Sequence, residues 1–290
     1  MRDDLSPPHA EVRRAVAHAL SEDLGALGDL TGSLVAERAV AHGAFVARSA
    51  GVIAGTSCLT TACALVDPAL AIEVERGDGR EVGAGDVVAR IHGPFRSLLV
   101  AERTALNFLC HLSGIATLTR RFVDAATKAN PRTRVLDTRK TTPGLRALEK
   151  AAVRAGGGWN HRASLSDAVL IKDNHLAGLS IEDAVATAIA RWPGRTIEVE
   201  CDTLVQVTRA LDAGATIVMC DNMSPTEVHE AVALVREHSR GRSGDVLLEA
   251  SGGITLDNVA AFAGAGADLI SVGAITHSAP VLDIGLDLGH

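Results

Sequence analysis

From about residue 133 onward, short apolar segments alternate with longer stretches in which apolar residues recur at helical spacing. The apolar segments cover residues 134–136, 168–171, 196–199, 216–219, 246–248 and 269–272. Strands that alternate regularly with helices predict a parallel β-sheet. The repeat of about 20–30 residues favours a βα barrel over a dinucleotide-binding sheet, and no GxGxxG motif opens a helix.

Two of the intervening helices carry start signals. Ser180 is followed by Asp183 in an arrangement that resembles a capping box, with Asp in place of the usual Glu. Ser224, Pro225 and Glu227 form a second capping box with proline at the first helical position. Helices are therefore expected to begin after Ser180 and Ser224.

The chain up to about residue 112 has a mixed α+β pattern. It predicts a helix over 9–24, a strand over 43–54, a pair of short strands within 80–92 and a helix over 96–112. We therefore expect an N-terminal domain at 1–112 and a barrel at 113–275. The last stretch, 276–290, is too short for another βα unit and is expected to pack back on the first domain.

Composition narrows the class of protein. Hydrophobic residues make up 47% of the chain but aromatic residues only 2%, so the core must consist of Ala, Val, Leu and Ile, as in parallel sheets and barrels. The sequence contains no apolar run of about 18 residues or more and no signal-peptide pattern. Five cysteines without a CxxC motif argue against disulfides and zinc. We expect a cytoplasmic protein that does not bind membranes.

Charge is distributed unevenly. Residues 137–175 carry seven Lys/Arg against four Asp/Glu, within a protein whose formal net charge is −7. A local basic segment in an acidic chain favours an anionic small molecule over nucleic acid, which requires a broadly basic face.

Polar or glycine-rich residues follow every predicted strand of the barrel. In chain order these clusters are Arg139–Lys140, Lys172–Asp173, Glu200 with Asp202, Asp221–Asn222, Glu249 with 251–253, and Gly273. The carboxyl ends of barrel strands face one mouth, where such folds place their active sites. We therefore expect these clusters to meet.

The predicted mouth contains two kinds of group. Arg139, Lys140, Arg162, Lys172 and His161 would supply positive charge and donors for carboxylates or phosphates. Glu200 and Asp221 could hold a divalent cation such as Mg²⁺, and Ser251-Gly252-Gly253 and Gly273-Ala274 let backbone N–H groups approach a phosphate. Each cluster taken alone has a plainer interpretation: solvated strand ends for the acids, tight turns for the glycines and a structural role for His161 and Arg162.

Several long motifs resemble those of the quinolinate phosphoribosyltransferases (nicotinate-nucleotide pyrophosphorylase, carboxylating). The motifs include DTRKTTPGLRALEK, GGGWNHR, LIKDNH, IEVECDT, CDNMSP, EASGGI and SVGAITHSAP, and the likeness covers nearly the whole chain. The resemblance implies an N-terminal α/β sandwich domain, an open or irregular α/β barrel of the type II phosphoribosyltransferase kind, and a homodimer at minimum. It implies a transferase that converts quinolinate and phosphoribosyl pyrophosphate to nicotinate mononucleotide, CO₂ and pyrophosphate during NAD synthesis.

The resemblance also implies a role for each matched residue. The quinolinate pocket would contain Arg103, Thr138, Arg139, His161, Arg162 and Lys172, with Arg103 supplied by the partner subunit. Phosphoribosyl pyrophosphate and Mg²⁺ would be bound by Lys140, Glu200 and Asp221, which with Lys172 form the expected catalytic set. The 5′-phosphate would be held by Ser251, Gly252, Gly253, Gly273 and Ala274.

Three alternatives stay open at this point. Lys172 ends a barrel strand, as the Schiff-base lysine of a lyase would. A paralogue could accept another pyridine-type acid on the same fold. A non-catalytic relative would be expected to lack some of the site residues, and none is missing.

Overall fold

The computed structural model describes residues 5–240 and 245–289. By their internal contacts these residues form two compact units that interleave along the chain. The first contains residues up to Arg120, Thr141–Gly157 and residues from Ile275 onward; the second contains Arg121–Lys140 and Gly158–Ala274. The domain boundary at 112/113 stays a prediction.

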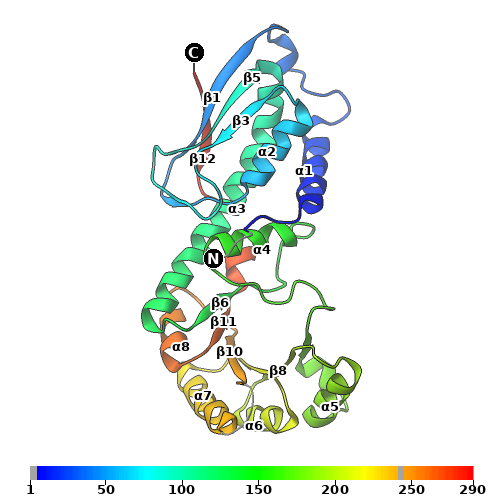
Figure 1. Cartoon of the computed structure of the whole chain (residues 1–290), viewed down its shortest axis with the longest axis vertical. Coiled ribbons are helices and arrows are strands. Elements are labelled where there is room, and N and C mark those ends of the chain that lie inside the picture. The colour runs from blue at the N-terminus through cyan, green and yellow to red at the C-terminus, as the bar shows by residue number, and fades with distance from the viewer. Residues whose placement is uncertain (1–4, 241–244, 290) are drawn as a thin grey trace. The chain divides into compact units, whose positions relative to one another are not determined.

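The first unit is built on a four-stranded antiparallel sheet in the order β12-β1-β5-β3 (Figure 1). Its strands are β1 (Val40–Ala47), β3 (Ala71–Val74), β5 (Val87–Pro94) and β12 (Ile284–Gly289). A small second sheet pairs β2 (Gly51–Val52) with β4 (Glu81–Val82). The helices are α1 (His9–Leu24), η1 (Gly32–Leu34), α2 (Thr56–Val66), the first part of α3 (Phe95–Ala129), and α4 (Arg146–Ala155).

Three predictions for this region need correction. The predicted strand 43–54 is two strands: β1 ends at Ala47, whose backbone N–H donates to the carbonyl oxygen of Asp86, and β2 follows at Gly51–Val52. The strands within 80–92 do not pair with each other: β4 pairs with β2, and β5 lies between β1 and β3. The helix expected over 96–112 continues to Ala129.

Gly114 lies within the long helix, at a position where its surroundings require glycine. A Cβ at this position would lie 2.1 Å from the carbonyl oxygen of Pro280, so glycine here permits a close backbone approach instead of a turn. The segment that follows Pro280 leads into β12, which pairs antiparallel with β1.

The second unit is a six-stranded parallel sheet in the order β6-β11-β10-β9-β8-β7. Its strands are β6 (Arg134–Leu136), β7 (Val169–Ile171), β8 (Ile197–Cys201), β9 (Ile217–Asp221), β10 (Leu247–Ser251) and β11 (Leu269–Ser271). The connecting helices are η2 (Asp173–Leu176), α5 (Ile181–Arg191), α6 (Leu204–Ala213), α7 (Pro225–Ser239) and α8 (Val259–Ala265), and α9 (Ala274–His277) begins where the unit ends. Figure 1 shows α5 to α8 on the outer side of the strands.

This sheet is an open barrel, as the resemblance implied. Within the described ranges, β6 and β7 are edge strands that pair with β11 and β8 respectively and not with each other. The helix between them, α4, belongs to the first unit by its contacts, so this βα repeat does not close the barrel. The predicted fold class is confirmed.

The sheet core is aliphatic, as the composition predicted: Val199, Val218, Leu248 and Ile270 are at most 1% exposed. The capping box predicted at Ser224 is complete, and the one predicted at Ser180 is present in part. The Ser180 hydroxyl accepts the Asp183 N–H, and Ser224 and Glu227 cap each other. No helix in the part of the chain that the structure describes is long and apolar enough to cross a membrane.

Candidate active site

A cavity of about 250 Å³ lies at the carboxyl ends of the barrel strands. Each of the six strands, or the residues just after it, contributes to the lining. The lining residues are Thr138, Arg139, Lys140, His161, Arg162, Leu170, Lys172, Glu200, Met219, Asp221, Glu249, Ser251 and Ser271. Charged residues far apart in sequence therefore meet in one pocket, as the clusters at the strand ends predicted.

Some predicted site residues do not line this cavity. Gly252, Gly253, Gly273 and Ala274 are absent from its lining, although they belong to the same unit. Arg103 belongs to the first unit, where it lies exposed on α3. Their assignments stay predictions.

The strands reach further into the pocket than the sequence predicted. β8, β9 and β10 end at Cys201, Asp221 and Ser251, each two or three residues beyond the predicted end. Glu200 and Asp221 therefore project from regular strand backbone instead of from loops. A side chain on a strand is held more precisely than one on a loop, which suits a site that works by positioning.

Arg162 is held on the rim by the backbone. Its Nη1 donates to the carbonyl oxygen of Ala168 at 3.0 Å. Burial and then the nearby Arg139 lower the pKa of the Arg162 guanidinium. Since like charges repel, the two guanidinium groups are arranged for an anion that would bridge them.

The loop that carries Arg162 is anchored beneath the pocket by Asp137, a residue that sequence reasoning did not select. Asp137 is fully buried and follows β6 directly. Its two carboxylate oxygens accept the backbone N–H of His161 at 2.9 Å and the amide of Asn160 at 2.5 Å. The residues at the end of β6 and the loop at 160–162 are thereby joined.

Lys172 forms an ion pair with Glu200 across the pocket. The Lys172 backbone N–H also donates to Nδ1 of His175 at 3.0 Å, which closes the turn that begins η2. Glu200 is nearly buried, with 10% of its side chain exposed. The ion pair directs the Lys172 side chain at the acidic side of the pocket.

Glu200 and Asp221 offer two carboxylates, which suits a cation that takes its remaining ligands from water and substrate. Asp221 accepts the side-chain amide of Asn222 at 2.7 Å. The described residues contain one cluster of three or more His, Cys, Asp or Glu with metal-ligand spacing, and it consists of His161, Glu198 and Glu249. Within those residues, Glu200 and Asp221 therefore have no third ligand of this type beside them. Mg²⁺ is often bound by one or two carboxylates plus water and substrate phosphates, so the donor set suits that ion.

The glycines after β10 form a tight turn, the plainer of the two interpretations. Gly252 and Gly253 have φ of 87° and 61°. A Cβ on Gly252 would lie 2.8 Å from the backbone nitrogen of Asn222, so only glycine fits. The turn brings the Ser251 end of β10 against the Asp221–Asn222 end of β9.

Three polar residues at the base of the pocket were not selected from the sequence: Glu249 and Ser271, which line it, and Glu198, which lies behind His161. Each is at most 5% exposed. A signal for the first was available, because Glu198 stands two residues before Glu200 and alternate strand residues share a face. Glu249 was noticed only as one member of a polar strand end.

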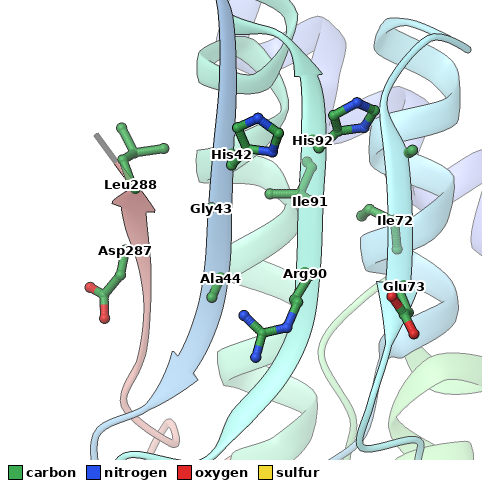
Figure 2. A pocket seen from close by; sticks show the side chains of 12 residues that line it. His42, Gly43, Ala44, Ile72, Glu73, Arg90, Ile91, His92, Asp287 and Leu288 are labelled. Atoms are coloured by element: carbon green, nitrogen blue, oxygen red, sulfur yellow. The ribbon is translucent and has the colours of Figure 1, made fainter.

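A second cavity, of about 660 Å³, lies on the sheet of the first unit. Figure 2 shows its side chains in front of β12, β1, β5 and β3, with helices behind the sheet. The rings of His42 and His92 are 5.3 Å apart. Glu73 and Asp287 supply the acids of this lining and Arg90 its guanidinium. This open surface lacks the converging cations of the barrel pocket.

Fold and pocket together define an α/β-barrel protein whose mouth contains both cationic and acidic side chains, and comparison with known proteins identifies the family. The model of the quinolinate phosphoribosyl transferase C-terminal domain matches residues 115–287, and the model of the N-terminal domain matches residues 29–113. The chain belongs to the quinolinate phosphoribosyltransferase family.

Relatives match over nearly the full length. The chain is 42% identical over 285 residues to the nicotinate-nucleotide pyrophosphorylase [carboxylating] of Mycobacterium leprae, covering 95% of this chain and 96% of that protein. It is 40% identical over 282 residues to the probable enzyme of the same name from Bacillus subtilis, covering 97% and 94%. The solved nicotinate-nucleotide pyrophosphorylase of Francisella tularensis superposes with a TM-score of 0.91 at 37% identity, covering 98% of each chain.

Proposed function

We propose that this chain transfers the phosphoribosyl group of phosphoribosyl pyrophosphate to quinolinate, with loss of CO₂, to give nicotinate mononucleotide and pyrophosphate for NAD synthesis. The observation that carries the proposal is the pocket itself, in which Arg139, Arg162 and Lys172 meet the acidic residues Glu200 and Asp221. The names of the relatives describe the same activity.

Quinolinate is assigned to the cationic side of the pocket. It carries two carboxylates on adjacent ring carbons, and planar guanidinium groups bind carboxylates through two parallel hydrogen bonds. Arg162, fixed by Ala168, and the neighbouring Arg139 supply such groups, and Thr138 adds a hydroxyl. Lys172 would exchange part of its interaction with Glu200 for a substrate carboxylate.

Phosphoribosyl pyrophosphate is assigned to the other side. Lys140 supplies an exposed ammonium for the phosphates, and Glu200 and Asp221 would hold Mg²⁺. When bound with the polyphosphate, Mg²⁺ neutralises part of the charge on the departing pyrophosphate. The backbone at 251–253 and 273–274 is proposed to receive the 5′-phosphate, because glycine turns let N–H groups approach closely.

The protein contributes orientation and charge, not a nucleophile. With quinolinate held beside the ribose, the ring nitrogen forms a bond to the anomeric carbon while the carbon–oxygen bond to pyrophosphate breaks. The carboxylate next to the now positive nitrogen then leaves as CO₂, and the electron pair left on carbon takes up a proton from water. Two anions must be held together for this reaction, so positioning and electrostatic stabilisation account for most of the catalysis.

The Schiff-base alternative is not favoured by the geometry of Lys172. A lysine nucleophile must be neutral, which requires burial in an apolar pocket or another cation nearby. Lys172 instead faces Glu200, and the side chain is 40% exposed. Neither condition is met by a half-exposed side chain that forms an ion pair with a carboxylate.

We further propose that the active form is a homodimer in which Arg103 of one subunit completes the quinolinate pocket of the other. Support comes from the family pattern and from the position of Arg103, which is exposed on a helix of the other unit. The cytoplasmic location also stays a prediction.

The direct test of function is quinolinate-dependent release of pyrophosphate and CO₂ by the purified protein, in the presence of phosphoribosyl pyrophosphate and Mg²⁺. We expect one equivalent of each product per nicotinate mononucleotide formed. Pyrophosphate release with another pyridine acid but not with quinolinate would instead identify a paralogue of different specificity. Activity unchanged after complete removal of divalent cations would contradict the metal assignment.

A further inference from the structure

The floor of the barrel pocket contains two buried carboxyl groups that the proposed reaction does not use. Glu198 on β8 and Glu249 on β10 are 1% and 0% exposed. They meet at the His161 ring, and the three ligand-type atoms of this cluster lie within 4.8 Å of one another. Two buried acids beneath a pocket for a dianion would oppose binding if both were ionised.

The hydrogen bonds of His161 fix the form of its ring. Its Nδ1 accepts the backbone N–H of Arg162 at 2.7 Å, so that nitrogen carries no proton. The proton is therefore on Nε2, which lies 3.0 Å from Glu198 Oε2 and 3.8 Å from Glu249 Oε2. By this geometry His161 is a neutral ring with its one N–H directed at the acids, and its assignment to the quinolinate pocket stays a prediction.

The same geometry argues against a metal ion in this cluster. A histidine that binds metal through one nitrogen donates the N–H of the other to an acceptor. Here the other nitrogen faces a backbone donor, so metal at Nε2 would require a fully deprotonated ring. The cluster holds a proton more readily than a metal.

The two acids have too few donors to be ionised together. Ser271 donates to Glu249 Oε1. Glu198 Oε1 and Glu249 Oε2, both buried, accept no hydrogen bond from any residue that the structure describes. A proton on one carboxyl group would remove the repulsion between the two acids. It would also turn one of these two oxygens into a hydrogen-bond donor.

The surroundings place that proton on Glu249. Burial, and next the charge of Glu198, raise the pKa of Glu249 to about 8. A positive charge on His161 would oppose this shift, but the His161 Nδ1 that accepts the Arg162 N–H carries no proton. The Ser271 hydroxyl and the charge of Lys172 also lower the pKa of Glu249, and they are outweighed. On β9, the residue in register with Glu249 is the uncharged Met219.

We propose that Glu249 is a positioning residue that carries a proton on the pocket floor, so that Glu249, Glu198 and His161 together present one negative charge to quinolinate and not two. The inference rests on the quinolinate pocket proposed above. At alkaline pH the proton is lost, and the second negative charge repels the dianion. Binding of quinolinate, more than turnover of the bound complex, should then weaken.

The test is the pH dependence of KM for quinolinate, measured from about pH 6.5 to about pH 9.5 on the full protein with saturating phosphoribosyl pyrophosphate and Mg²⁺. For the unaltered protein we expect a constant KM up to about pH 8. Above about pH 8, KM should rise about tenfold per pH unit, because one proton must be bound for quinolinate to bind, and kcat should change much less. In Glu249→Gln, a neutral isostere, KM should stay flat over the whole range.

Two further variants make the result specific. Glu230→Gln changes an exposed acid on α7 and should follow the unaltered protein at every pH. Ser271→Ala removes a hydrogen bond that lowers the pKa of Glu249, so the rise in KM should begin at higher pH. This second variant keeps the inference testable if Glu249→Gln does not fold.

The inference is overturned if KM of the unaltered protein is flat to about pH 9.5, or if Glu249→Gln keeps the alkaline rise. Stoichiometric metal in the purified protein that is lost in Glu249→Gln would also overturn it. Failure of the pocket assignment is distinguishable, because Arg162→Ala would then leave KM for quinolinate unchanged at neutral pH. If Arg162→Ala raises that KM while Glu249→Gln keeps the alkaline rise, only the proton assignment is wrong.

Discussion

Replacement of Arg162 by alanine is the sharpest test of the substrate orientation. The Arg162 guanidinium is half-buried, hydrogen-bonded to Ala168 at 3.0 Å and close enough to Arg139 to lower the Arg162 pKa. The truncation removes one of the groups assigned to the dicarboxylate and leaves the strands unchanged. We expect a large rise in KM for quinolinate and almost none in KM for phosphoribosyl pyrophosphate.

The magnitude follows from what the guanidinium contributes. Loss of one member of a desolvated, charge-assisted pair costs about 2–5 kcal/mol, which corresponds to about 30-fold to about 5,000-fold in kcat/KM. Two features place the effect near the lower end. One arm of Arg162 is already engaged by Ala168, and Arg139 keeps a positive charge in the pocket. We therefore expect a loss of about 100-fold.

Initial rates of pyrophosphate release against quinolinate concentration provide the measurement. Arg195→Ala is the matched control, since Arg195 is an exposed arginine of the same unit with one long bond, 3.4 Å, to the Asp167 carbonyl. Its kinetic constants should equal those of the unaltered protein. A change of less than about threefold in kcat/KM for Arg162→Ala would refute the assignment, because no desolvated charge pair contributes so little.

Gly114→Ala should destabilise the protein by about 1–3 kcal/mol in denaturant unfolding, because its Cβ would overlap the Pro280 carbonyl. Gly264→Ala, in open space on α8, should instead stabilise the protein by about 0.5–1 kcal/mol. Equal effects of the two substitutions would contradict this packing. Arg103→Ala and Arg162→Ala proteins, each strongly impaired alone at quinolinate concentrations below KM, should regain about a quarter of normal activity when subunits are exchanged, and no recovery would exclude a shared pocket. Because the pKa of Glu249 is raised by folding, its stabilising proton is fully present at low pH and lost as pH rises through about 8. Between about pH 5 and about pH 8, ΔG of unfolding of the unaltered protein should therefore fall relative to Glu249→Gln by about 1.4 kcal/mol per pH unit, and parallel curves would contradict the shift.

The sequence predicted the barrel strands well because their apolar residues are short, dense and bounded by polar or glycine-rich turns. It placed the ends of β8, β9 and β10 too early: at the first polar residue for β8 and β10, and one residue before Cys220-Asp221 for β9. Parallel-sheet hydrogen bonds join backbone groups and continue past a polar side chain wherever that side chain points into a polar cavity. Glu200, Asp221 and Ser251 are such residues. Polar side chains that would normally mark the end of a strand therefore lie within strands at the candidate active site.

The errors in the first unit have a different origin. The need for glycine at position 114 within α3 depends on Pro280, which lies 166 positions later in the chain. The partners of β4 and β5 likewise depend on non-local pairing, in which β5 takes β1 and β3 instead of its neighbour in sequence. A local sequence pattern contains neither contact, so the role of Gly114 and the order of the strands could not be predicted from it.

His161 shows the limit of assigning chemistry from residue type. In sequence it stands beside Arg162 within a basic segment, and that composition favours a second cation for the substrate. The backbone turn between the two residues instead makes the N–H of Arg162 a hydrogen-bond donor to the His161 ring, which leaves that ring neutral and facing Glu198. The neighbouring side chains therefore have opposite tasks: the guanidinium supplies charge to the pocket, and the imidazole joins the acids below it. The positive character of the pocket depends as much on a proton held on its floor as on the cations along its rim.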